Sequence, residues 1–80
     1  MIQLRVLVSL KASVFDPQGH TTLDALHGLG YKSLKDLRQG KSFLLTFEGI
    51  DEAEAKRQAE EIAAKVLSNP VIESFRIERV

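Results

Sequence analysis

Hydrophobic and polar residues alternate at the start of the chain. The alternation covers residues 2–11, and its hydrophobic positions are Ile2, Leu4, Val6, Val8 and Leu10. The other face carries polar residues together with one leucine, Leu7. A period of two is typical of a β-strand with one buried face. We therefore predict a first strand over residues 2–11.

A helix is predicted directly after this strand. Asp16 is a favourable N-cap, and Pro17 suits the first helical position, where its missing N–H would have no partner. Leucines then recur at helical spacing, at Leu23, Leu26 and Leu29. The pattern predicts a helix over residues 17–29. A later start stays open, because Thr21 and Asp24 resemble a capping box.

The middle of the chain, residues 33–49, has the pattern of two β segments. The glycine of Gly40-Lys41 suits the first central position of a two-residue type II′ hairpin. One long strand with a glycine bulge is the alternative. In the second segment, one face carries Phe43, Leu45 and Phe47, and the other carries Ser42, Leu44, Thr46 and Glu48.

A second helix and a last strand follow. Asp51 with Glu54 forms another start signal that resembles a capping box. One helical face then carries Ala55, Ala59, Ile62, Ala63, Val66 and Leu67. The helix should end at Ser68-Asn69-Pro70, because a residue before proline avoids the helical region. Residues 71–80 alternate again, with Val71, Phe75 and Ile77 on one face.

The order β-α-β-β-α-β favours an α+β fold in a single domain, residues 1–80. We expect a ferredoxin-like sandwich in which two helices cover one face of a mainly antiparallel sheet. A chain of this length buries only roughly 60% of its unfolded surface, so oligomerisation is a common stabiliser. Three apolar residues, Leu7, Leu44 and Ile72, are expected on the opposite sheet face. They are the candidate self-association face of a dimer or higher assembly.

Composition excludes several classes of protein. Cysteine is absent, which rules out disulfides and thiolate metal sites. Eleven basic and eleven acidic residues balance, unlike the excess of positive charge in a nucleic-acid-binding domain. No apolar segment reaches the roughly 20 residues of a membrane span, and Met1 leads directly into a strand pattern rather than a signal peptide. We expect a cytoplasmic domain that binds neither nucleic acid nor membrane.

Side chains for catalysis or metal binding are not grouped in this sequence. The two histidines, His20 and His27, are seven residues apart, which is too far for the i, i+4 pairing of a zinc site. Neighbouring carboxylates occur only on predicted helix surfaces, as at Glu60 and Glu61. There is no P-loop and no G-x-G-x-x-G motif. We therefore expect no catalytic, cofactor-binding or metal-binding residue on this chain.

The start of the first helix is the one place where an anion could bind. Helix N-termini attract anions, and Gln18 and Gly19 lie there, with three cations as possible helpers: Lys11, Arg38 and Lys41. Capping alone explains Asp16 and Pro17. It does not explain Gly19, since glycine inside a helix costs about 1 kcal/mol relative to alanine. This glycine indicates a close approach, either by a ligand or by a neighbouring chain.

At these same residues the sequence resembles a known family. The segments are "VSLKASVFDPQG", "ALHGLGY", "DLRQGKSFLLTFEG" and "LSNPVIESFRIE", and together they look like PurS, the small subunit of formylglycinamide ribonucleotide amidotransferase. The resemblance runs through nearly the whole chain and is most specific from Lys11 to Gly19. Arg38-x-Gly40-Lys41 and Asn69-Pro70 support it. Gln39 departs from the small aliphatic residue more usual in the family, which affects local packing.

The resemblance implies a role in the fourth step of de novo purine synthesis. There the enzyme, also called phosphoribosylformylglycinamidine synthase, converts FGAR to FGAM with ATP, Mg and glutamine. In the split form, PurS dimers join a PurL ligase to a PurQ glutaminase and are thought to help shelter ammonia. The resemblance thus implies a homodimer or tetramer, no cofactor on this chain and no catalytic residue. The candidate partner-interface residues are Asp16, Pro17, Gln18, Gly19, Arg38, Gly40, Lys41, Asn69 and Pro70.

Two other functions remain as rivals. One is a dimeric regulatory domain of the same topology that binds a small molecule, to which Gly19 could belong. The other is RNA binding on the open sheet face, which requires aromatic side chains there. The aromatic residues Phe43, Phe47 and Phe75 instead share the predicted core face, so the RNA-binding alternative is weak.

Overall fold

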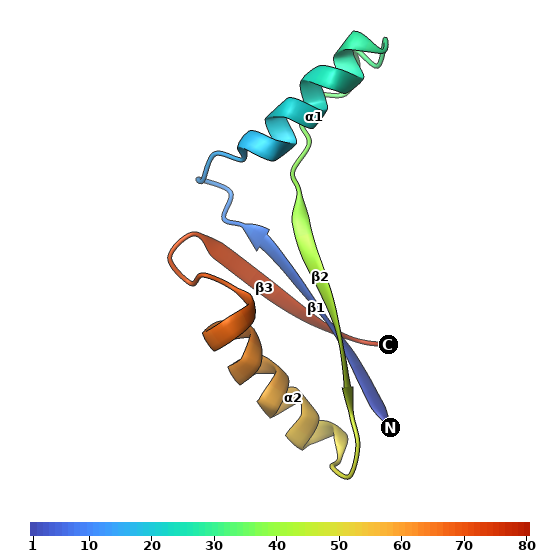
Figure 1. Ribbon diagram of the computed structural model, residues 1–80, viewed down its shortest axis with the longest axis vertical. Coiled ribbons are helices and arrows are strands. Elements are labelled where there is room, and N and C mark those ends of the chain that lie inside the picture. The colour runs from blue at the N-terminus through green and yellow to red at the C-terminus, as the bar shows by residue number, and fades with distance from the viewer.

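The computed structural model describes residues 1–80 and contains a sheet with one helix packed on it and a second helix that projects beyond it (Figure 1). In chain order the elements are β1 (Ile2–Leu10), α1 (Pro17–Gly28), β2 (Gly40–Phe47), α2 (Glu52–Ile62), its continuation η1 (Ala63–Leu67) and β3 (Glu73–Arg79). The α+β class and the antiparallel sheet that the sequence predicts are confirmed.

The sheet has the strand order β2-β1-β3, with both pairs antiparallel. Val6 of the central strand is paired with Phe43 on one side and with Ile77 on the other. Because β1 has neighbours on both sides, its inward side chains Leu4 and Val6 are fully buried. The period-two pattern thus identified the core face correctly.

A stripe of alanines holds α2 against this core face. The carboxylate of Asp51 accepts a hydrogen bond from the Glu54 backbone N–H at 2.9 Å, which confirms the predicted cap. Ala55, Ala59 and Ala63 are fully buried, each in a cluster with β1 side chains. α2 lies mainly over β1 and β3.

The end of the second helix differs from the predicted stripe. Residues 63–67 form the π-helical turn η1, in which the Ser68 N–H donates to the Ala63 carbonyl at 3.0 Å. This i→i+5 spacing widens the turn, so the side chains after it leave the phase of an α-helix. Val66 is 76% exposed, and its predicted place in the core is wrong. Val71, in the turn before β3, is 77% exposed because it has no strand partner.

The structure has three strands, not the four that the sequence predicts. Pairing between β1 and β2 stops at Ser9 and Gly40, because β1 ends at Leu10. Residues 33–39 therefore have no strand to pair with. The predicted hairpin turn at Gly40-Lys41 is wrong, as is its alternative of one long bulged strand, since Gly40 is the first residue of β2.

The predicted position of the first helix on the sheet is also wrong. α1 projects from the end of the sheet, and residues 31–39 return beside it to β2 (Figure 1). We call residues 11–39, which leave and rejoin the sheet, the arm. The His27 ring Nε2 lies 2.6 Å from the Leu34 carbonyl oxygen, which links α1 to the returning segment. The arm thus packs on itself instead of on the sheet.

The result is an elongated molecule, with extents of 50 × 25 × 14 Å and a radius of gyration of 16.0 Å. Only 8 of its 80 residues are buried, and Asp16 and Gly19 are the two of these that lie in the arm. Neither helix combines the length and the apolar character that a membrane span requires.

Candidate interaction site at the base of the arm

Asp16 ties together the two ends of the arm. Its side chain is only 5% exposed. One carboxylate oxygen accepts a hydrogen bond from the Gly19 backbone N–H at 2.9 Å, and the other accepts from the Gln39 backbone N–H at 2.7 Å. The first bond caps α1, and the second fixes the segment that enters β2. One side chain therefore sets where the helix begins and where the arm closes.

The hydrogen bond from Gln39 and then that from Gly19 hold the pKa of the Asp16 carboxyl below its ordinary value, and the nearby Arg38 charge acts in the same direction. A lowered folded-state pKa means that ionised Asp16 stabilises the fold above the ordinary pKa of aspartate. That contribution is lost as the pH falls through the ordinary value toward the lowered one.

We expect Asp16→Asn to unfold at lower urea concentration than the wild type near neutral pH, because the amide offers one acceptor where the carboxylate offers two. The difference should shrink as the pH falls below about 4, where the wild-type carboxylate also becomes protonated. Urea unfolding followed by circular dichroism at several pH values measures this. Asp24→Asn, on the exposed side of the same helix, is the control. A difference that grows toward low pH would contradict the expectation.

Gly19 lies where the arm's two segments come closest. A Cβ at this position would lie 2.5 Å from the Leu37 carbonyl oxygen and 2.6 Å from a carboxylate oxygen of Asp16. A close approach is therefore present, but the atoms that make it belong to this chain, the Leu37 carbonyl and the Asp16 carboxylate, and not to the ligand or neighbouring chain that the sequence indicated. Gly40 is similar, since its Cβ would lie 2.6 Å from the Val8 carbonyl oxygen. At each of these two positions, the absence of a side chain lets two backbone segments lie close together.

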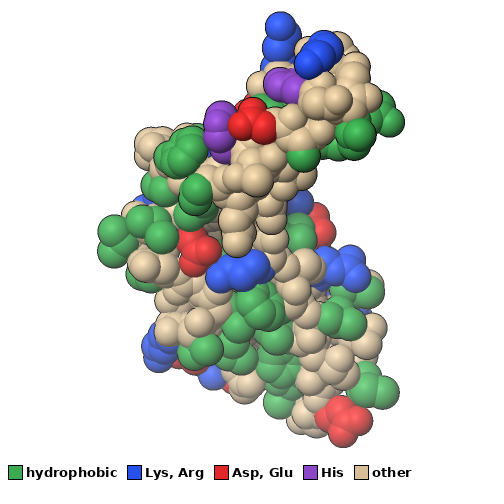
Figure 2. All heavy atoms as spheres, turned by 45° about the horizontal axis from the view of Figure 1, so that its top comes forward, with side chains coloured by type: hydrophobic (Ala, Val, Ile, Leu, Met, Phe, Trp, Pro, Cys, Tyr) green, Lys and Arg blue, Asp and Glu red, His purple; other side chains and the backbone are tan.

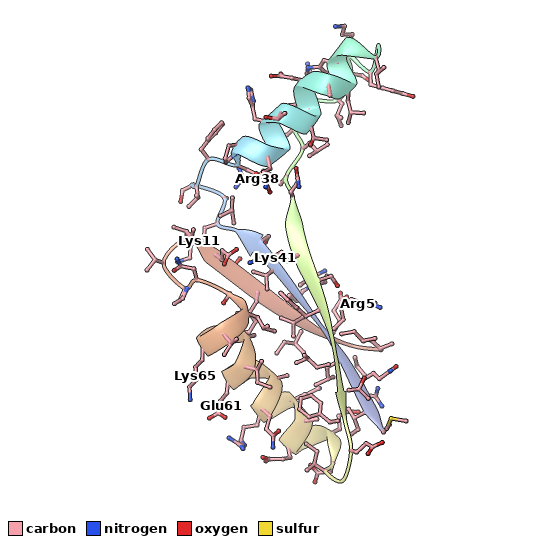
Figure 3. The ribbon with its side chains drawn as sticks, in the orientation of Figure 1. Arg5, Lys11, Arg38, Lys41, Glu61 and Lys65 are labelled. Atoms are coloured by element: carbon pink, nitrogen blue, oxygen red, sulfur yellow. The ribbon has the colours of Figure 1, made fainter.

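Arg38 supports the loop that leads into α1. Its Nη2 donates to the carbonyl oxygens of Lys11 and Val14, at 3.0 and 2.7 Å. Figure 3 places Lys11, Arg38 and Lys41 around the point where the arm meets the sheet. The Lys41 ammonium lies 3.4 Å from the Glu73 carboxylate. Arg38 and Lys41 therefore already have partners within the chain.

Asn69 and Pro70 form the turn between η1 and β3. The Asn69 side-chain oxygen accepts from the Val71 N–H at 3.0 Å, and its backbone carbonyl accepts from the Glu73 N–H at 2.7 Å. The Asn69 N–H donates to the Glu73 carboxylate at 2.7 Å. Glu73 thus joins this turn to Lys41 and to the base of the arm. The sequence alone does not reveal that Glu73 makes both contacts, because they depend on how β3 and β2 lie on either side of β1.

Several of the predicted interface residues lie around one open depression of about 390 Å³ at this base. Its lining includes Asp16, Pro17, Gln18, Gly40 and Lys41, and also Glu73. Two carboxylates and one paired lysine are unsuited to a free anion. The N–H of Gly19, which a phosphate would need, already donates to Asp16. No group of three or more metal-ligating side chains occurs in the structure.

The predicted self-association face is less continuous than expected. Leu7 is half-buried and Leu44 is 53% exposed, both on the outward face of the sheet. Ile72, 38% exposed, lies in the turn before β3 and not on the sheet. Around the two leucines the outward face is polar, with Arg5 and Ser42 beside them in the register.

Comparison with known proteins places this architecture in a family. The family model of PurS, described as phosphoribosylformylglycinamidine (FGAM) synthase, matches residues 3–80. The chain belongs to the PurS family. PurS of Bacillus subtilis, named a phosphoribosylformylglycinamidine synthase subunit, is 42% identical over 78 residues, covering 98% of this chain and 92% of the relative.

Two solved structures extend the likeness to three dimensions. PurS of Methanocaldococcus jannaschii, a subunit of formylglycinamide ribonucleotide amidotransferase, superposes with a TM-score of 0.89 at 32% identity, over 100% of this chain and 96% of that one. A chain in the structure of PurLQS from Thermotoga maritima gives a TM-score of 0.90 at 26% identity, over 99% and 96%. The projecting arm is therefore part of a shape that other PurS chains share.

Proposed function

We propose that this chain is the bridging subunit of a split formylglycinamide ribonucleotide amidotransferase and binds a PurL ligase and a PurQ glutaminase. The observation that carries the proposal is the likeness, over 99% of this chain, to a chain in PurLQS from Thermotoga maritima. In this proposal the chain itself carries no catalytic residue. The role of the subunit in the complex is structural. The complex as a whole converts FGAR to FGAM in purine biosynthesis.

In this function the ATP, Mg and glutamine are used by the two partners, within the cytoplasm. The chain associates with itself as a dimer or tetramer. The depression at the base of the arm is the candidate contact surface for a partner, because it presents fixed backbone and ion-paired side chains with little freedom left to lose on binding. The residues there are Asp16, Pro17, Gln18, Gly40 and Lys41, with Gly19 and Arg38 behind them and Asn69 and Pro70 beside Glu73.

Reconstitution tests the proposal. The wild-type chain is mixed with PurL and PurQ from the same organism in the presence of glutamine and Mg-ADP, and the complex is measured by light scattering after size-exclusion chromatography. We expect a peak containing all three proteins, and glutamine-dependent FGAM formation that needs this chain. In the control, ammonia replaces glutamine. FGAM formation by PurL should then depend far less on this chain. A chain that binds neither partner and leaves glutamine-dependent activity unchanged would refute the proposal.

A further inference from the structure

Glu73, the first residue of β3, carries the least exposed carboxylate of any ion pair in the molecule. Its side chain is 14% exposed, whereas the other acidic side chains in ion pairs are all at least 38% exposed. A carboxylate withdrawn from water is costly unless charge and hydrogen bonds compensate it. Both are present here: the Lys41 ammonium lies 3.4 Å from one oxygen, and the Asn69 N–H donates to the other at 2.7 Å.

This carboxylate is connected to both segments that join the arm to the sheet. We call these two segments, residues 10–12 and 39–41, the neck (Figure 1). The lysine that pairs with Glu73 belongs to the second segment. The first segment is held by the residue before Glu73, since the Ile72 carbonyl accepts from the Lys11 N–H at 2.8 Å. One acidic residue therefore acts on both sides of the neck.

Glu73 also closes the turn that precedes β3. Its backbone N–H donates to the Asn69 carbonyl at 2.7 Å, and the Ile72 N–H donates to the same carbonyl at 3.1 Å. Its side chain accepts from the N–H of the same asparagine, so the turn is closed in both directions. A turn closed in this way holds the Ile72 carbonyl in the position from which it fixes Lys11.

The direction of the arm depends on the neck, because α1 makes no extensive contact with the sheet or with α2. Hydrogen bonds inside the arm hold it together as a unit: Asp16 accepts from the Gly19 and Gln39 N–H groups, and Arg38 donates to the loop before α1. Figure 2 shows side chains of Lys or Arg and of Asp or Glu near one another between the arm and the body of the molecule. A rigid unit on two connecting segments takes its direction from the contacts at those segments.

The depression at the base of the arm extends across the neck. Asp16, Pro17 and Gln18 line it from the arm, whereas Lys41 and Glu73 line it from the sheet. Its shape therefore changes if the arm turns relative to the sheet, even when neither part changes internally. A partner that fits this depression requires one direction of the arm, and a neck that presets this direction lowers the entropy lost on binding.

We propose that Glu73 is a positioning residue for assembly of the amidotransferase. Through Lys41 and the turn before β3, it sets the arm in the direction that the partner's surface requires. This role rests on the proposed function and names a residue that acts within it. Glu73 acts through the neck, by raising the fraction of chains whose arm has the binding direction. Loss of the ion pair lowers that fraction and weakens the apparent affinity in proportion.

Glu73→Gln tests this role, with Glu78→Gln as the matched control. The amide can still accept from the Asn69 N–H but carries no charge for Lys41. Glu78 lies on the same strand, in an exposed ion pair with Arg76 at 3.1 Å, and is paired with Arg5 away from the neck. Circular dichroism checks that both variants fold.

The first readout is glutamine-dependent FGAM formation as wild type or variant is titrated into PurL and PurQ. We expect Glu73→Gln to raise the concentration of chain at half-maximal activity at least about fivefold, with the same maximum at saturation, and Glu78→Gln to raise it less than about twofold. A shift no larger than that of Glu78→Gln, or a lowered maximum at saturation, would overturn the proposal.

The second readout is the direction of the arm in the chain without its partners. Residual dipolar couplings of the amides in α1 and in the sheet are fitted to the wild-type structure with one alignment tensor. We expect one tensor to fit both parts in wild type and in Glu78→Gln. In Glu73→Gln, α1 and the sheet should each fit well alone but need different tensors. One tensor that fits both parts of Glu73→Gln as well as it fits wild type would contradict a positioning role.

Lys41→Gln decides the matter if Glu73→Gln does not fold. It removes the same ion pair from its exposed side, because Lys41 is 54% exposed, and it leaves the bond between Asn69 and Glu73 in place. We expect it to need different tensors for α1 and the sheet, as for Glu73→Gln. An arm direction identical to that of wild type in Lys41→Gln would overturn the proposal.

Failure here is distinguishable from failure of the proposed function. If wild type supports glutamine-dependent activity with PurL and PurQ while Glu73→Gln matches it in both readouts, the bridging function stands and Glu73 has no positioning role. If wild type binds neither partner, the proposed function fails whatever direction the arm takes.

Discussion

Gly19→Ala is expected to destabilise the chain by about 2 kcal/mol, although alanine is normally the better helix former. The new Cβ would lie 2.5 Å from the Leu37 carbonyl and 2.6 Å from the Asp16 carboxylate, so the returning segment must move away. That movement also stretches the hydrogen bond from the Gln39 N–H to Asp16, now 2.7 Å. Urea unfolding at fixed chain concentration measures the loss, and hydrogen exchange of the arm amides shows where it occurs.

Gly28→Ala is the matched control. Gly28 is in the same helix, and a Cβ there meets nothing within 4 Å. With no clash to relieve, alanine should stabilise the chain by about 0.5–1 kcal/mol through its higher helix propensity. If both variants stabilise, the contact between Gly19 and the returning segment does not constrain the arm.

Leu4→Ala is expected to cost about 3 kcal/mol, the largest effect of any single truncation in the sheet. Leu4 is fully buried on the central strand, in a cluster with Ala55 and Ala59 of α2. Removing a buried leucine loses its transfer free energy and leaves a cavity. The whole stability of an 80-residue domain is only about 4–12 kcal/mol, so the variant should be partly unfolded under mild denaturing conditions. Thermal and urea unfolding both measure this.

Leu44→Ala separates the two faces of the same sheet. Leu44 is 53% exposed and opposes Arg5 on the outward face. Its truncation should change stability by less than about 0.5 kcal/mol. Comparable losses from Leu4→Ala and Leu44→Ala would mean that the assignment of core and outward faces is wrong.

The sequence was informative wherever a local pattern determined the structure. Alternation located β1, the caps Asp16 and Asp51 located both helix starts, and the alanines at 55, 59 and 63 located the buried face of α2. Those signals depend on residues a few positions apart. The position of α1 and the fate of residues 33–39 depend instead on where β1 ends, because a strand forms only where another strand is available to pair with it.

The candidate site was predicted as a set of residues but not as an arrangement. The motif around Asp16 and the segment Arg38-x-Gly40-Lys41 do meet at one depression. What the sequence could not show is that the atoms engaged there are largely backbone: the Leu37 carbonyl beside Gly19, the Gln39 N–H on Asp16, and the Lys11 and Val14 carbonyls on Arg38. Every residue has these groups, so side-chain identity does not reveal which of them are used.

The elongated shape changes how the chain behaves on a sizing column. By the scaling that holds for compact proteins, a radius of gyration of 16.0 Å belongs to a chain of about 185 residues, more than twice this length. A monomer would therefore elute at or before the position of a compact dimer. A calibration with globular standards would overstate its mass, whereas light scattering and sedimentation equilibrium, which weigh the particle independently of its shape, would assign it correctly.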